Sequence, residues 1–253
     1  MIQWYSTYKL HHKKVASFSK DSIFFCGDAA HVHSPAGGQG MNTGLQDAYN
    51  LAWKLALVIN GEAKQTLLNT YHEERNPVAE NLLKTTDRMF SLMSQNKTTD
   101  VLLRMYLVPS IMPVLMKVKS FRRKFFLLVS QTEINYNSSS LSKGEAGKLK
   151  AGMRFPYIKL SLNNEIISGF QFIRSNAFKP FLLLYYGIEV YNLQNKLYTS
   201  AQIERNSFND DALHNAAFSA SFICLLRPDN YIGYIAETFN QTELDQYLHS
   251  ILD

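Results

Sequence analysis

The stretch of chain with the clearest chemical character is residues 23–55, which read IFFCGDAAHVHSPAGGQGMNTGLQDAYNLAWKL. Its first four residues form an apolar run typical of a buried strand, and the run ends at Gly27 and Asp28. A loop with three glycines then leads into a predicted helix. Glycine lets a ligand approach the backbone closely, and the first N–H groups of a helix point outward at the positive end of its dipole. The pattern predicts a site for an anion or a dipole, with Asp28 as the acceptor for a hydroxyl-bearing ligand.

The helix that follows this loop must position the site. Its apolar residues recur at helical spacing and predict one buried face, formed by Leu45, Ala48, Ala52, Leu55 and Ile59. Gly61 lies just past its end, where a left-handed cap residue is favoured. A second helical stretch runs from residue 64 to 75, and Pro77 then acts either as a kink or as the first turn of a new helix.

Residues 100–130 form an apolar, Met-rich and basic region that predicts helices broken by Pro109 and Pro113. The basic cluster is best interpreted as a solvated helix face, with contact to a membrane surface as the alternative; it comprises Lys117, Lys119, Arg122, Arg123 and Lys124. The longest strongly apolar stretch without charge, residues 105–116, is too short for a bilayer, which needs about 20 residues. We therefore expect no stable membrane insertion, and a soluble, cytoplasmic protein.

The second half of the chain changes character. Residues 135–150 are polar and rich in Ser and Gly, which predicts a linker or long loop. Beyond them, residues 181–186 and 221–226 are apolar runs typical of buried strands, and the RPDN sequence after the second run favours a hairpin turn. The chain closes with an amphipathic helix over residues 242–252. Helices before residue 130 and strands after it predict an α/β protein.

The motif GDAAHxxxPxGGQGxNxGxxDAxNLxWKL resembles the second FAD fingerprint of the class A flavoprotein monooxygenases, the p-hydroxybenzoate hydroxylase-like aromatic hydroxylases. The matching positions are Asp28, His31, Pro35, Gly37, Gly40, Asn42, Asp47, Asn50, Trp53 and Lys54. The segment TYHEERNPVAE that follows is similar to a Tyr-x-x-Glu-Arg-x-Pro helix of the same family. The pieces INYNSSSLS, GMRFPYIKL and LLRPDNYIGYI resemble, more loosely, the thioredoxin-like C-terminal domain of the phenol hydroxylase and polyketide hydroxylase branch.

The resemblance implies a domain organisation. Residues 1–130 would be the C-terminal part of a glutathione reductase-type FAD-binding domain, mostly helical here. Residues 131–150 would be a linker, and residues 151–253 a thioredoxin-like α/β domain without a CxxC pair. No GxGxxG occurs in the 253 residues, so the resemblance implies a fragment without the ADP-binding unit, which on its own would bind FAD weakly and be inactive.

The resemblance also implies roles for individual residues. Asp28 would accept hydrogen bonds from the ribityl chain of FAD, and Pro35, the candidate catalytic residue, would lie beside the reactive edge of the flavin ring. The glycine loop, through Gly38 and Gly40, would contact the cofactor. The backbone N–H groups of Met41 and Asn42 would face the pyrimidine edge of the flavin, where fixed dipoles stabilise an anionic ring.

The implied function is an aromatic ring hydroxylase that uses FAD, NAD(P)H and O2 on a small aromatic substrate. The alternative is a non-catalytic remnant or interaction module built on the thioredoxin-like domain. A homodimer or a complementing N-terminal chain is the expected protein partner. Up to residue 130 the chain has 16 Lys and Arg against 9 Asp and Glu, but the composition favours a solvated surface, and no nucleic acid partner is expected.

The remaining candidates have structural interpretations. His31 and His33 lack a third ligand at a suitable spacing, so no metal site is predicted and His31 is expected to be a hydrogen-bonding residue behind the loop. Cys26 and Cys224 form no CxxC pair, and Cys26 is expected to be an inert buried thiol. Asp47 and the Glu73-Glu74-Arg75 run are expected to form caps and ion pairs around the helices.

Overall fold

The computed structural model of the chain falls into two compact units. It describes residues 11–34, 38–94, 101–157, 159–162, 165–176, 179–188, 197–203 and 221–252. Unit 1 comprises Met1–Leu51 and Tyr71–Glu133, and unit 2 comprises Ala52–Thr70 and Ile134–Asp253. The helix α1 (Gly40–Ile59) therefore contributes its first part to unit 1 and its last part to unit 2.

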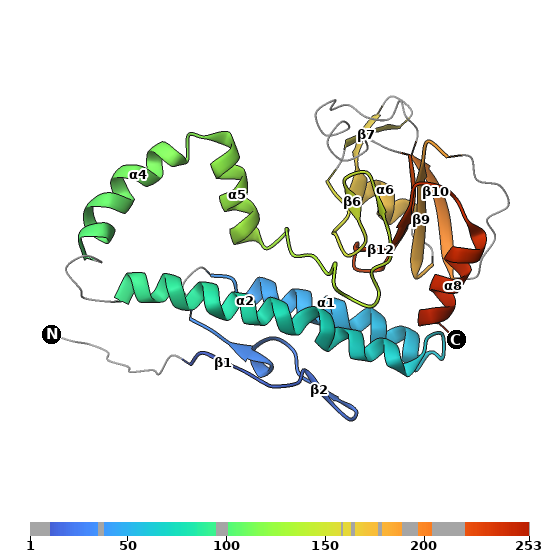
Figure 1. Cartoon of the computed structure of the whole chain (residues 1–253), viewed down its shortest axis with the longest axis horizontal. Helices are drawn as coiled ribbons and strands as arrows, with labels where there is room; N and C mark the ends of the chain where they lie inside the picture. The colour runs from blue at the N-terminus through green and yellow to red at the C-terminus, as the bar shows by residue number, and fades with distance from the viewer. Residues whose placement is uncertain are drawn as a thin grey trace. The chain divides into compact units, whose positions relative to one another are not determined.

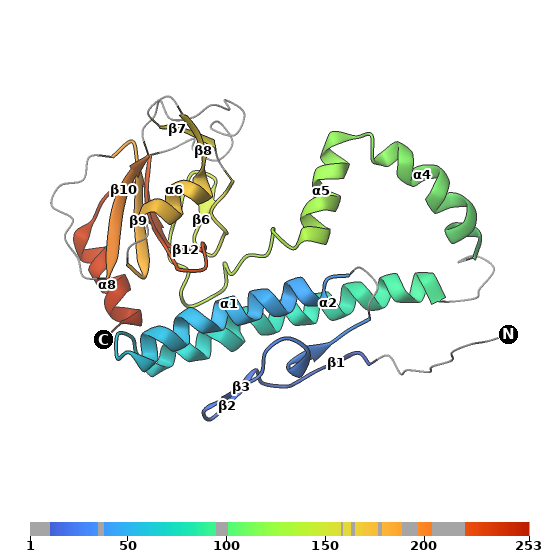
Figure 2. The ribbon, with the colours of Figure 1, turned by 180° about the vertical axis from the view of Figure 1, so that it is seen from behind.

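Unit 1 is mostly helical. The helices α1 and α2 (Asn69–Ser94) run side by side in both views (Figures 1 and 2). Pro77 lies inside α2, which continues through it, so the prediction that one helix ends at residue 75 and that Pro77 begins a new one is wrong. Gly61, just beyond α1, has φ +72°, which confirms the predicted left-handed cap. Short antiparallel strand pairs precede α1: β1 (Lys13–Lys14) with β4 (His31–Val32), and β2 (Ser19–Lys20) with β3 (Ile23–Phe24). The prediction of a buried strand in the apolar run 23–26 is wrong, since β3 spans two residues and Ile23 is 61% exposed.

The predicted buried face of α1 is wrong. Leu45 and Ile59 are 62% and 78% exposed, and Ala48 and Ala52 are also exposed. The buried residues of the helix are instead both polar and apolar: Thr43, Asp47, Asn50, Leu51, Trp53, Lys54 and Leu57. The reason is that the polar residues of α1 find partners on α2, so burial follows hydrogen bonding as well as apolar character.

The region after residue 100 is helical, as predicted. It comprises a π-helical segment η3 (Leu103–Leu107), α4 (Val108–Leu115) and α5 (Lys119–Ser130). Pro109 lies in the first turn of α4 and Pro113 within it. Most side chains of α4 and α5 are exposed, apolar ones such as Phe126 and Val114 included. In the described part of the chain, no helix is both long and apolar enough to cross a membrane.

Unit 2 is built on a four-stranded sheet in the order β10-β9-β11-β12. Its strands are β9 (Phe181–Tyr186), β10 (Tyr198–Ile203), β11 (Phe222–Leu226) and β12 (Ile232–Ala236). β10 runs parallel to β9, whereas β9–β11 and β11–β12 are antiparallel. The predicted strand at 181–186 and the predicted hairpin after Leu226 are thus confirmed.

Each face of this sheet has its own apolar core. Alternating residues of β9 point to opposite sides, so Leu182 and Leu184 join one cluster and Phe181 and Leu183 the other. The helix α6 (Gly169–Asn176) packs into the first cluster, and α8 (Gln241–Ile251) packs into the second (Figure 2). The predicted apolar side of α8 is buried as expected; it consists of Leu244, Tyr247, Leu248 and Ile251. The remaining elements are η2 (Gln65–Leu68), β5 (Glu145–Ala146), β6 (Leu149–Lys150), β7 (Lys159–Leu162) and β8 (Glu165–Ser168).

The linker predicted for residues 131–150 is not a linker in the structure. From Ile134 this segment belongs to unit 2, and its apolar side chains are buried; they are Tyr136, Leu141, Ala146 and Leu149. Its serines close turns, since Ser142 Oγ donates to the Tyr136 carbonyl at 2.7 Å. Its glycines occupy backbone that a side chain would not fit. A Cβ on Gly144 (φ +95°) would lie 2.0 Å from the Ile235 carbonyl oxygen, so the Ser and Gly content serves tight packing rather than flexibility.

A buried arginine joins three parts of unit 2. Arg227 is 2% exposed and forms a bidentate pair with Asp229, with Nη2–Oδ2 and Nε–Oδ1 distances of 2.6 and 3.0 Å. Its guanidinium lies 5.2, 5.4 and 5.6 Å from the ring centres of Trp53, Tyr136 and Tyr231. Trp53 Nε1 donates to Asp229 Oδ2 at 3.1 Å. We call these five residues the Arg227 cluster.

Candidate functional site

The carboxylate predicted to bind a ligand lies on a short turn next to α1. Residues Gly27–Ala29 form a single 3-10 turn (η1), closed by the Ala30 N–H to Gly27 carbonyl hydrogen bond at 2.8 Å. Gly27 has φ +57° and its Cα lies against Gly44, where an added Cβ would be only 3.4 Å away. The side chain of Asp28 is exposed. The turn therefore presents its carboxylate to solvent within about one helical turn of the start of α1.

Two glycines at the start of α1 have different surroundings. A Cβ on Gly38 (φ +64°) would meet no atom within 4 Å, whereas a Cβ on Gly40 would lie 3.3 Å from Nε2 of His33. Gly38 thus leaves open space, and Gly40 makes room for a neighbouring side chain. Met41 is 75% exposed and Asn42 partly buried, and the first N–H groups of a helix have no acceptor within it. Pro35, the predicted catalytic residue, lies outside the described residues.

Behind the turn lies a buried network centred on Asp47. Its Oδ1 accepts from Arg75 Nε at 2.6 Å, and its Oδ2 accepts from His31 Nε2 at 2.7 Å and from the Gly27 N–H at 3.2 Å. All three side chains are at most 2% exposed. Burial would raise the pKa of Asp47, but the hydrogen bond from His31 and the charge of Arg75 outweigh it and hold the pKa below its ordinary value. The predictions of an ion pair for Asp47 and of a hydrogen-bonding role for His31 are confirmed.

This lowered pKa predicts a pH dependence of stability. A carboxyl whose pKa is lower in the folded than in the unfolded state stabilises fully above its unfolded pKa, about 4 for Asp, and loses that contribution as the pH falls through its folded value. We therefore expect the free energy of unfolding to fall below about pH 4. Urea unfolding measured between about pH 7 and 3 would show the decline in the wild type and a smaller one in Asp47→Asn. Parallel profiles for the two proteins would contradict the prediction.

The thiol and the second histidine of the motif have local partners. Cys26 is half-buried, with its sulfur 3.8 Å from the Gly44 carbonyl oxygen, and burial raises its pKa, which keeps the thiol protonated as expected for an inert cysteine. His33 Nδ1 lies 2.7 Å from the carbonyl oxygen of Ser34. Among the residues that the structure describes, no group of three or more His, Cys, Asp or Glu could hold a metal ion.

Sequence reasoning missed how α5 meets the start of α1. Gln39 Nε2 donates to the Leu128 carbonyl at 2.9 Å, and the side chains of Thr43 and Gln131 are hydrogen-bonded at 2.9–3.0 Å. These contacts fix the C-terminal end of α5 against the loop that precedes α1. Pattern analysis gave no signal for them, because glutamines in a polar or amphipathic stretch are usually solvated.

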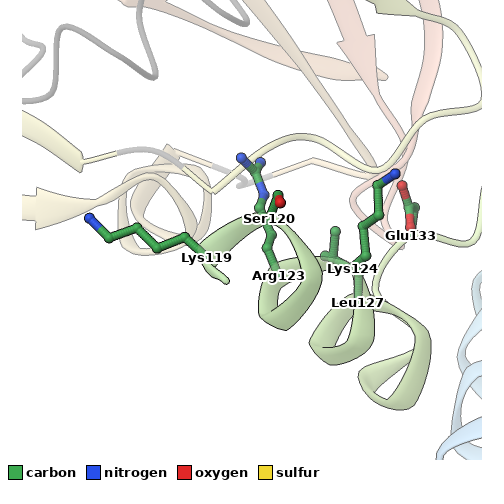
Figure 3. Close-up of a pocket in the computed structure, with 6 residues that line it drawn as sticks. All are labelled: Lys119, Ser120, Arg123, Lys124, Leu127 and Glu133. Atoms are coloured by element: carbon green, nitrogen blue, oxygen red, sulfur yellow. The ribbon is translucent and has the colours of Figure 1, made fainter. Parts of the chain in front are cut away.

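A hollow lies along α5 and contains none of the predicted site residues (Figure 3). It has a volume of about 460 Å³ and is lined by Lys119, Ser120, Arg123, Lys124, Leu127 and Glu133. The side chain of Lys124 reaches toward Glu133, whereas that of Lys119 points away from it (Figure 3). The lining carries three basic residues and one carboxylate, an excess of positive charge. Its basic side chains are exposed on the surface, which limits their attraction for an anion.

Comparisons with known proteins agree on one family. The family model described as an FAD binding domain matches residues 1–86. Pentachlorophenol 4-monooxygenase of Sphingobium chlorophenolicum is 48% identical over 91 residues, which are 36% of this chain and 17% of that enzyme. A flavin-dependent monooxygenase of Mycobacteroides abscessus is 33% identical over 240 residues, or 94% of this chain and 42% of that protein. The chain is a member of the FAD-dependent aromatic monooxygenase family.

Solved structures of such monooxygenases share the fold along nearly the whole chain. CabE, an aromatic hydroxylase from angucycline biosynthesis, superposes with a TM-score of 0.71 at 28% identity, and the match covers 97% of this chain and 48% of CabE. The anhydrotetracycline hydroxylase OxyS from Streptomyces rimosus gives a TM-score of 0.68 at 26% identity. The chain thus spans about half the length of these relatives, 46% in the case of OxyS.

Proposed function

We propose that the chain forms the flavin-ring side of an FAD-dependent monooxygenase that hydroxylates a small aromatic substrate with O2 and NAD(P)H. The observation that carries the proposal is the exposed carboxylate of Asp28, set on a packed turn beside the glycine-lined start of α1. When bound, FAD would supply the oxygen and hydride chemistry. The named relatives, a pentachlorophenol monooxygenase and an aromatic hydroxylase, support the aromatic substrate class.

The residues present fit the cofactor at several points. Asp28 would accept hydrogen bonds from the ribityl hydroxyls, because a carboxylate is an acceptor for several donors at once. Gly38 leaves space for the ring, and the N–H groups of Met41 and Asn42 would face its pyrimidine edge, where the positive helix end favours negative charge. Pro35 would lie at the reacting edge. The order and strand directions of the sheet support our proposal that unit 2 is thioredoxin-like.

The proposal assigns the two ends of FAD, the flavin and the ADP part, to different parts of the enzyme. The 253 residues contain no GxGxxG, the motif that binds the pyrophosphate and ADP part of FAD in such enzymes. We propose that full activity requires such an ADP-binding unit, and that the chain alone binds FAD weakly and does not turn over. Homodimerisation, or a complementing polypeptide, would be compatible with this requirement.

The test is FAD binding by the chain with and without the Asp28 carboxylate. We expect Asp28→Asn to weaken binding about tenfold or more, since a hydrogen bond to a charged group contributes roughly 1.5–3 kcal/mol. Quenching of flavin fluorescence during titration of FAD with protein measures the affinity. Asp21→Asn is the matched control, because Asp21 is also an exposed carboxylate, on the turn between β2 and β3. Equal affinities in Asp28→Asn and Asp21→Asn would contradict the proposed site.

A further inference from the structure

Three buried ionisable groups of unit 1 have no part in the proposed contacts with FAD. They are His31, Asp47 and Arg75, with exposed fractions of 2%, 0% and 0%. Burying charged groups is costly unless they are paired and hydrogen-bonded, so a network of this kind in a small unit calls for an explanation. Helix packing alone does not require it, because apolar residues of similar volume stabilise a helix pair at least as well.

The two oxygens of Asp47 serve different elements. Oδ1 binds Arg75 of α2, whose Nη2 also donates to the Thr43 carbonyl of α1 at 3.2 Å. Oδ2 binds the Gly27 N–H at the start of η1 and the ring of His31 on β4, just beyond that turn. The Asp47 carboxylate therefore binds residues on both sides of the turn η1, while Arg75 of α2 neutralises its negative charge.

The turn η1 carries Asp28, and the hydrogen bond from the Gly27 N–H to Asp47 fixes the start of this turn. We call this hydrogen bond the tether. Gly27 has φ +57°, and the turn spans only three residues. Its close approach to Gly44 brings the backbone of the turn against α1, at the helical turn between Asp47 and the helix start. A shift of the Gly27 N–H away from Asp47 would therefore change the direction in which the exposed Asp28 carboxylate points.

We propose that Asp47 is a positioning residue, which directs the Asp28 carboxylate through the Gly27 N–H toward the hydroxyls of a bound polyol chain. The inference rests on the proposed function for its ligand, FAD, but the tether itself can be observed without the ligand. An amide at position 47 would not replace the carboxylate. It has one acceptor oxygen and would turn an NH2 group toward at least one of three donors, Gly27, His31 or Arg75.

The matched control lies on the same two helices. Asn50 of α1 donates through Nδ2 to Glu74 of α2 at 2.7 Å, and both side chains are buried, at 1% and 3% exposure. Glu74→Gln makes the same carboxyl-to-amide change as Asp47→Asn at the same helix pair, but the Glu74 carboxylate binds Asn50 of α1 where the Asp47 carboxylate binds Gly27 of the turn. A purely structural role for Asp47 would make the two variants behave alike.

The tether is measured on the full chain without FAD. Gly27 is the only one of the 12 glycines that follows a cysteine, so carbonyl-13C-cysteine and 15N-glycine labelling yields one amide signal, that of Gly27. An amide proton bound to a carboxylate resonates downfield. We expect this proton signal to move upfield in Asp47→Asn and to stay in place in Glu74→Gln. Because Asp47→Asn removes the carboxylate that neutralises the buried Arg75, Asp47→Asn with Arg75→Gln serves as a second, charge-neutral variant.

The consequence for the ligand is measured by FAD titration of the same proteins. We expect about tenfold weaker binding in Asp47→Asn and in the charge-neutral variant, and an unchanged affinity in Glu74→Gln. An unmoved Gly27 signal, or equal weakening in Glu74→Gln, would overturn the positioning role. So would failure of both Asp47 variants to fold while Glu74→Gln folds. If the wild type binds no FAD, the proposed function fails, while the Gly27 signal still decides whether Asp47 holds the turn.

Discussion

Replacing Arg227 with methionine is expected to lower the free energy of unfolding by about 3–5 kcal/mol, because it leaves the carboxylate of Asp229 buried without its counter-charge. Asp229 is only 3% exposed, so water does not reach it to compensate. The substitution also removes the guanidinium cation from the rings of Trp53, Tyr136 and Tyr231, which it contacts in the wild type. Urea unfolding followed by circular dichroism measures the loss.

A surface pair provides the control for this experiment. Lys150 Nζ lies 2.9 Å from Glu145 Oε2 in the same unit, with more than half of each side chain exposed. Lys150→Met should cost no more than about 1 kcal/mol, as is usual for exposed ion pairs. The double variant Arg227→Met with Asp229→Asn should recover part of the loss, since no buried charge remains. A cost for Arg227→Met as small as that for Lys150→Met would show that the Arg227 cluster adds little to stability.

Replacing Gly152 with alanine is the second change expected to have a large effect, about 3–5 kcal/mol of unfolding free energy. Gly152 has φ +85°, and an added Cβ would lie 2.4 Å from the Tyr136 carbonyl carbon and 2.5 Å from the Asn137 nitrogen. Both obstacles are backbone atoms, so no side chain rotation relieves the clash. The backbone at this position is also fixed, since Gly152 donates to the Ile232 carbonyl at 2.7 Å and accepts from the Tyr136 N–H at 2.8 Å.

Gly61 separates the two causes of this cost. It has a similar left-handed backbone, with φ +72°, but an added Cβ would meet no atom within 4 Å. Gly61→Ala should therefore cost only about 1–2 kcal/mol, the strain of the backbone conformation alone. Equal losses for both substitutions, measured by the same urea unfolding, would mean that the segment around Tyr136 yields to the added methyl group.

The parts of the fold that the sequence predicted correctly are those where apolar residues decide burial. The strand at 181–186, the apolar side of α8 and the hairpin after Leu226 follow from simple periodicity and turn chemistry. The prediction failed for α1, because its buried side is held by Asp47 and Asn50, whose partners come from α2. Periodicity counts apolar residues within one segment and carries no information about polar partners far away in the sequence.

The candidate site shows the same division. The glycines of the motif predicted a close approach of the backbone, and Gly27 does lie against Gly44, whereas the roles of Asp28 and Gly38 toward a ligand stay predictions. The cluster around Arg227 was not found, since the RPDN sequence indicated only a turn. Likewise, the serines and glycines before Gly152 predict a linker or a long loop, and the structure shows a loop that packs within unit 2. The packing of both segments escaped the prediction because a polar sequence looks the same whether its groups face water or each other.

The path of α1 through both units has a consequence for how this protein could be rearranged by recombination. Unit 2 needs the stretch Ala52–Thr70, whose Trp53, Leu57 and Leu67 belong to its apolar core. A single crossover near residue 134 would therefore transplant the sheet without part of its interior. Gene shuffling or domain grafting that keeps unit 2 intact requires three crossovers, after residues 51, 70 and 133, and the first of them lies inside α1. The two units are therefore inherited together more readily than apart.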